Sequence, residues 1–141
     1  FSPLNEQKRK KVLDIVQKEL LTPRGIRSLS PRDSRYKGHY SGDHTRREEC
    51  LHQGTAWPWL LGMFADAWIT VYKDAGMAFL YELLNNFQEV MKEHGIGSIS
   101  EIYDGDPPYK PNGAISFAPG VAEILRIVHM TSKKKFNKRK K

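Results

Sequence analysis

The stretch from Trp57 to Lys73, "WPWLLGMFADAWITVYK", limits the fold more than any other part of the sequence. Pro58 suits the first turn of a helix. Apolar side chains then occupy most of the helix circumference, with only Asp66 and Lys73 charged. Because a helix that is apolar nearly all round must be covered on several sides, the sequence predicts an interior helix at about 57–73.

Three further helices are predicted on either side of it. Residues 3–21 and 76–94 are amphipathic, and 119–130 are mostly apolar. The apolar stripe of 76–94 is formed by Leu80, Leu84, Phe87 and Met91. We therefore expect outer helices at 3–21 and 76–94 and inner helices at 57–73 and 119–130. No run shows the period of two that is typical of strands. The predicted fold class is all-α: antiparallel helical hairpins, in a small bundle or in an arc of a toroid of paired helices.

The connections between these helices alternate in length. The first has about 35 residues, the second only a few and the third about 24. In antiparallel helices this order places both long loops at one end, above the N-termini of the two inner helices. Loops of this length are uncommon in compact domains and are usually functional.

Length, charge and cysteine content limit the function classes. The 141 residues suit one domain, and no apolar run is long enough to cross a membrane. Cys50 alone excludes an internal disulfide and a multi-cysteine zinc site, and we expect a cytoplasmic protein. The chain starts at Phe1 without an apolar signal segment. We expect a piece of a longer chain or a processed protein.

The net charge of +7 comes from the C-terminus. Residues 133–141, "KKKFNKRKK", contain seven Lys or Arg and no acid, so residues 1–132 have a formal charge of zero. We therefore predict one helical domain over 1–132 and a flexible basic tail over 133–141. A domain that uses this tail to bind nucleic acid is a possible alternative, but the neutral body argues against it.

The first long loop and the start of the next helix combine aromatic rings with planar hydrogen-bonding groups. A pyranose has an apolar face that stacks on Trp or Tyr, and a rim of hydroxyls that bind Asp, Arg, His and Gln. The pattern therefore indicates a sugar site. Trp59 and Trp68 are assigned to the core, whereas Trp57 suits the core or the sugar equally. The candidate substrate-binding residues here are Arg24, Tyr40, Asp43, His52, Gln53 and Trp57.

Metal and cofactor sites are not predicted. His39, His44 and His52 lack the helical spacing of a zinc protease site. The chain has no glycine-rich phosphate loop after a strand. Cys50 beside His52 is more typical of a small buried thiol than of a nucleophile.

The second long loop contains "GIGSISEIYDGDPPYKPNG", residues 95–113. Glu101 lies between Ile99 and Ile102, with Tyr103 following. A carboxylate partly shielded from water can serve in acid–base catalysis, but an exposed loop residue or a helix cap is also consistent. Asp104 and Asp106 are interpreted as turn formers.

Three motifs in this order resemble one known family. They are "TPRGIRSLSPRDSRYKGHYSGD", "HQGTAWPWLLGMFADAW" and "GIGSISEIYDGDPP". Together they resemble the C-terminal part of glycogen debranching enzymes, in the amylo-α-1,6-glucosidase domain, over the chain to about Ile127. The resemblance implies an (α/α)6 toroid, of which this chain would form an arc of about four helices. It also implies glycogen or a branched α-glucan, and the remainder of the toroid, as partners.

The resemblance further implies inverting hydrolysis of α-1,6-linked branch stubs, which releases glucose. Glu101, in "SISEI", matches the family's general base, with Tyr103 as a further substrate contact. The general acid lies in an upstream segment that nothing here matches, so we expect the isolated chain to be inactive. Phe117, Pro119 and Gly120 depart from the Gln, Trp and Ser that the family more often shows. The alternative is a non-catalytic helical module that binds carbohydrate or a partner.

Overall fold

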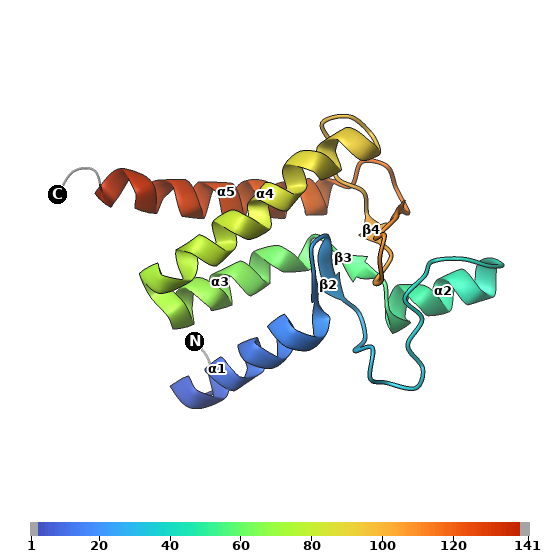
Figure 1. The fold of residues 1–141 in the computed structure, drawn as a ribbon, viewed down its shortest axis with the longest axis horizontal. Coiled ribbons are helices and arrows are strands. Elements are labelled where there is room, and N and C mark those ends of the chain that lie inside the picture. The colour runs from blue at the N-terminus through green and yellow to red at the C-terminus, as the bar shows by residue number, and fades with distance from the viewer. Residues whose placement is uncertain (1–2, 139–141) are drawn as a thin grey trace.

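The computed structural model describes residues 3–138 of the chain. Its longer helices run side by side at one end of the molecule, and loops with a small sheet form the other end (Figure 1). No helix in the described part is long and apolar enough to span a membrane. The helices are α1 (Glu6–Ile15), α2 (His44–Gln53), α3 (Leu60–Tyr72), α4 (Met77–Glu93) and α5 (Ala118–Lys138), with a π-helical turn η1 (Val16–Leu20) and a 3-10 turn η2 (Lys73–Gly76).

The four predicted helices are confirmed. The 3–21 prediction corresponds to α1 with η1, 57–73 to α3, 76–94 to α4, and 119–130 to the first part of α5. Asn5 begins α1 by accepting a hydrogen bond from the Lys8 N–H at 2.9 Å. Gly95, with φ of +67°, follows the end of α4.

The apolar core lies between α3, α4 and α5, with α1 on one side. Trp68, predicted to be core, is 6% exposed and stacks with Phe64, Tyr72 and Phe79. Its indole N–H donates to the Gly76 carbonyl at 3.1 Å. The other large buried side chains of this core are Leu13, Leu61, Leu80, Leu83, Phe87, Val90, Ile124 and Ile127.

The burial of the inner helices is less complete than predicted. Met63 on α3 is 51% exposed, and Leu125 and Val128 on α5 are 62% and 42% exposed. On α5 these side chains form an apolar side that the rest of the described chain does not cover, whereas Met63 shares the exposed side of α3 with Asp66 and Thr70. In α1 the buried position is Leu13, whereas Val12 is 49% exposed.

The predicted all-α fold, an arc of an (α/α)6 toroid made of helices alone, is wrong. The chain also contains a five-stranded antiparallel sheet in the order β1-β2-β3-β4-β5. Strands this short cannot show an alternating pattern, which explains why the sequence did not indicate them. The strands are β1 (Leu21–Thr22), β2 (Gly25–Arg27), β3 (Ala56–Trp57), β4 (Ile102–Tyr103) and β5 (Pro111–Asn112).

The sheet brings the two long loops to one end of the molecule, as the connection lengths predicted. Strands β1, β2 and β3 belong to the first long connection, and β4 and β5 to the second. The Ala56–Tyr103 pair joins the two sets. Figure 1 shows this end beside the start of α3 and the end of α4. The sheet therefore positions the loops that carry the candidate site residues.

Candidate functional site

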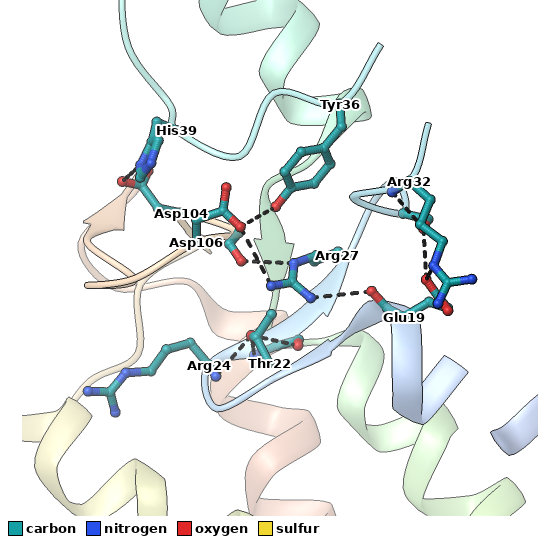
Figure 2. A network of polar contacts seen from close by, with 12 residues as sticks. Glu19, Thr22, Arg24, Arg27, Arg32, Tyr36, His39, Asp104 and Asp106 are labelled. Atoms are coloured by element: carbon teal, nitrogen blue, oxygen red, sulfur yellow. Dashed lines mark hydrogen bonds and ion pairs between the residues drawn. The ribbon is translucent and has the colours of Figure 1, made fainter. Parts of the chain in front are cut away.

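Asp104 connects the second long loop to the first. It is 5% exposed, and its Oδ1 accepts hydrogen bonds from the Tyr40 N–H and the Asn112 side-chain amide, both at 2.9 Å. Its Oδ2 lies 3.1 Å from Nδ1 of His39, whose side chain is 56% exposed (Figure 2). A buried carboxylate needs such donors, so Asp104 does more than form the turn that the sequence predicted.

A second connection between the loops is built on Arg27, a residue on β2. Its guanidinium donates to the Gly105 carbonyl at 2.8 Å and lies 3.6 Å from Oδ1 of Asp106. The Tyr36 hydroxyl donates to the same oxygen at 2.9 Å (Figure 2). Burial, together with this hydrogen bond to a carboxylate, raises the pKa of Tyr36 to about 12. The phenol therefore stays a donor at neutral pH.

Glu101 lies immediately before β4 and is half-buried. Its Oε2 accepts a hydrogen bond from the Ala114 N–H at 3.0 Å, and its own N–H donates to the Ala114 carbonyl at 2.9 Å. The flanking side chains of Ile99 and Ile102 are buried, at 3% and 0% exposure. The backbone of Ala114 therefore holds one oxygen of the carboxylate, and the catalytic role of Glu101 stays a prediction.

Ser100, the residue before Glu101, is held from two sides. Its hydroxyl lies 2.8 Å from Nδ1 of His94, and its N–H donates to the Tyr103 hydroxyl at 3.2 Å. Tyr103 is 1% exposed, and burial raises the pKa of its phenol. Tyr103 is thus a core residue in this structure, and it supports the backbone beside Glu101.

The candidate sugar contacts of the first loop lie at the same end of the molecule. Trp57 is half-buried on β3, the strand that pairs with β4, and its indole N–H donates to the Leu51 carbonyl at 3.1 Å. Tyr40 is half-buried beside Asp104, and His52 is exposed on α2. Gln53 is half-buried at the end of α2, where its carbonyl accepts from the Lys37 N–H at 2.6 Å.

Two of the predicted substrate-binding residues, Asp43 and Arg24, already form hydrogen bonds within the protein. Asp43 is the N-cap of α2 and accepts from the Arg46 N–H at 2.9 Å. Arg24, at the β1–β2 turn, donates to the Asn86 carbonyl at 2.9 Å and to Glu93 at 2.8 Å, both on α4. Figure 2 shows the Arg24 side chain pointing away from Asp104 and Asp106. The structure does not bring Arg24 together with the other candidates.

Sequence reasoning missed the roles of His39, Arg27 and Tyr36. Each contacts a residue that lies 65 to 78 positions away in the chain, and no local pattern marks such a pairing. Within the described residues, no group of three or more His, Cys, Asp or Glu side chains is placed to hold a metal ion.

The family comparison matches residues 1–126 to the model described as Amylo-alpha-1,6-glucosidase. The chain belongs to the amylo-alpha-1,6-glucosidase family. The resemblance drawn from the three motifs is therefore confirmed, and membership relates the chain to glycogen debranching and to branched glucans as substrates. No curated protein matches the chain.

The family match includes Glu101 and every candidate sugar contact, and it ends within α5. The domain division at residue 132 and the flexible basic tail stay predictions. Of that tail, residues 139–141 lie outside the described part of the chain.

Proposed function

We propose that this segment supplies the general base and part of the sugar-binding surface for inverting hydrolysis of α-1,6-glucosidic branch stubs, which releases glucose. The observation that carries the proposal is the placement of Glu101. This glutamate lies within the family-matched residues, at the end of the molecule where both long loops meet, with one oxygen held by Ala114. Its side chain is half-buried, so the carboxylate is partly accessible to water, as a general base that activates a water molecule must be.

In this reaction Glu101 takes a proton from a water molecule while the water oxygen attacks the anomeric carbon. A second carboxylic acid gives its proton to the glycosidic oxygen as the bond between that oxygen and the anomeric carbon breaks. Inversion requires the two carboxyl groups to lie about 6.5–9.5 Å apart, with the water on the far face of the sugar. Both roles are needed in every turnover.

The general acid is proposed to come from residues outside these 141. The nearby aspartates have other roles that support this assignment. Asp43 caps α2, and Asp104 and Asp106 accept hydrogen bonds that join the loops. An aspartate engaged in this way is poorly placed to deliver a proton to a sugar oxygen.

Trp57 and Tyr40 are the proposed stacking surfaces, and His52 and Gln53 the proposed partners of sugar hydroxyls. All four belong to the first loop or its adjoining elements, and β3, which contains Trp57, pairs with β4, the strand directly after Glu101. Arg24, Asp43 and Tyr103 are assigned a supporting role because their polar groups already have partners.

The test is Glu101→Gln in an active protein that contains this segment. We expect kcat to fall by about 10²–10⁴-fold or more, since the amide cannot take a proton, with KM and the melting temperature nearly unchanged. Azide should partly restore turnover to Glu101→Ala by attacking from the face that water normally uses. Near-normal kcat in Glu101→Gln would place the base elsewhere.

Glucose release by the 141-residue chain alone tests whether the general acid lies outside these residues. We expect it to release no glucose from a branch-stub oligosaccharide. Robust turnover that is abolished by Asp43→Asn or Asp106→Asn would show that the acid lies within the chain. If instead the complete protein binds branched glucan and releases no glucose, the segment is a carbohydrate-binding module.

A further inference from the structure

The side chain of Glu101 lies directly against Gly113. A Cβ built on Gly113 would be 2.6 Å from Oε2 of Glu101 and 3.0 Å from its Cβ. Contacts of this length are not compatible with a side chain at position 113 unless Glu101 moves. Because glycine has no side chain, the Glu101 carboxylate can occupy the space where a Cβ at position 113 would lie.

Gly113 also has φ of +70°, the left-handed conformation that favours glycine. This turn directs the next peptide group back toward Glu101. As a result, Ala114 contacts Glu101 twice: its N–H donates to Oε2 at 3.0 Å, and its carbonyl accepts from the Glu101 N–H at 2.9 Å. One residue thus fixes both the backbone and the carboxylate.

The two oxygens of Glu101 are not equivalent. Oε2 is bound by Ala114, whereas no hydrogen bond from the described residues reaches Oε1. Oε1 is therefore the oxygen with no donor among the described residues, and the one left for a water molecule. Because a hydrogen bond constrains the distance and angle between its atoms, the Ala114 N–H limits the orientations that the carboxylate can take.

We propose that Gly113 and Ala114 are positioning residues for the Glu101 carboxylate, holding one oxygen so that the other faces the reacting water. This inference rests on the proposed function. The backbone turn at Gly113, and not only the Glu101 side chain, then sets the alignment of the base. Misplacing a catalytic group by about 1 Å can lower a rate by about 10²-fold.

The same loop contains a matched control. Gly97 has φ of +78°, and a Cβ there would meet nothing within 4 Å. Alanine at either position therefore introduces similar backbone strain. Only Gly113→Ala also displaces the carboxylate. The shortest contact is with Oε2, at the end of a flexible side chain that can rotate away, and the 3.0 Å approach to the Glu101 Cβ requires only a small shift.

The first measurement uses the 141-residue chain and does not depend on catalysis. Hydrogen exchange of the Ala114 amide, corrected for its neighbours, should be slow in the unmodified chain. We expect protection to be lost in Glu101→Ala and in Gly113→Ala and retained in Gly97→Ala. Retained protection in Gly113→Ala, or equal loss in both glycine variants, would overturn the proposed anchor.

The second measurement uses an active protein that contains the segment. Gly113→Ala should lower kcat by about 10–10²-fold with KM unchanged, whereas Gly97→Ala should keep the kcat of the unmodified enzyme. Equal kcat in the two variants would overturn the positioning role. If alanine prevents folding, the pair Gly113→Asn and Gly97→Asn replaces it, since asparagine tolerates a positive φ better.

The kcat values of Glu101→Gln and Gly113→Ala distinguish failure of the proposed function from failure of the positioning role. If Glu101→Gln keeps its kcat, Glu101 is not the base, and the positioning role in catalysis fails with it. If Glu101→Gln is inactive but Gly113→Ala retains full kcat, the base is correct and only the anchor is wrong.

Discussion

The contacts between α3, α4 and α5 are mainly apolar, with the Arg126–Asp66 ion pair and the Tyr81–Thr131 hydrogen bond in addition. The two long loops contribute Ile99 and Tyr103 to the same core, but they are also joined to each other by charged and hydrogen-bonded side chains. Among the helices, Leu61, Phe87 and Ile127 are each no more than 2% exposed. At the loop end, Asp104 and Asp106 gather donors from residues far along the chain. One region excludes water from hydrocarbon, and the other satisfies polar groups.

The two kinds of contact differ in how strongly they depend on direction as well as in their strength. Apolar packing is not directional and depends on the area removed from water, so it sets how stable the helices are. A hydrogen bond fixes the distance and angle between two particular atoms. The hydrogen bonds between the loops therefore set where Tyr40 and strand β4 lie relative to each other, and they contribute less to stability than the apolar core does.

The largest loss of stability is expected for a substitution in the helical region. Phe87→Ala removes a side chain that is 2% exposed and should lower the free energy of unfolding by about 3–5 kcal/mol, measured by urea denaturation. Leu125→Ala, at a position that is 62% exposed, should change it by about 0.5 kcal/mol or less. Similar losses in the two variants would mean that the helices do not pack as described.

An intermediate loss of stability is expected for Asp104→Asn at the loop end. The amide replaces a buried anionic acceptor shared by three groups, and should destabilise the protein by about 1–3 kcal/mol. Amide exchange should show the change at Tyr40, with the core amides of α3 and α4 unaffected. The control is Asp43→Asn, because asparagine caps a helix as well as aspartate does. Uniform loss of protection in α3 and α4 would contradict the division into two regions.

The smallest effect is expected for Tyr36→Phe, which loses one half-buried hydrogen bond and about 1 kcal/mol at neutral pH. It should also change the alkaline behaviour. The pKa of Tyr36 is raised from 10.0 to about 12 in the folded state, so the unfolded chain loses this proton first. Stability should fall as the pH rises from about 10 to about 12, and fall less steeply in Tyr36→Phe. Equal slopes would show that this phenol is not held by Asp106.

The sequence predicted the helical region well because its information is local. The repeat of Leu80, Leu84, Phe87 and Met91 indicates a helix. It gives the buried face only in part, because Met91 is 37% exposed whereas Leu83 and Val90 are buried. For α2 the apolar repeat is absent, since "HTRREECLHQ" is mostly polar. Its end signals were present: Asp43 is the N-cap, and Gly54 follows the last turn.

The loop end was predicted only in part. The connection lengths indicated that both loops meet, and the motif placed Glu101 among apolar neighbours. The sheet was missed because a two-residue strand such as Ala56–Trp57 has no period to detect. The Arg27–Gly105 and Tyr40–Asp104 contacts join residues 78 and 64 positions apart, and only the three-dimensional fold reveals them.

The pairing of Ala56 with Tyr103 also bears on the order in which the chain folds. These residues flank the whole α3–α4 hairpin. Joining them before the hairpin exists would require closing a long flexible loop, with its loss of chain entropy. Once α3 and α4 pack, their ends bring the two strands close, and contacts near in sequence generally form sooner. We therefore expect the β3–β4 pairing to form after α3 and α4 pack and to open before they separate.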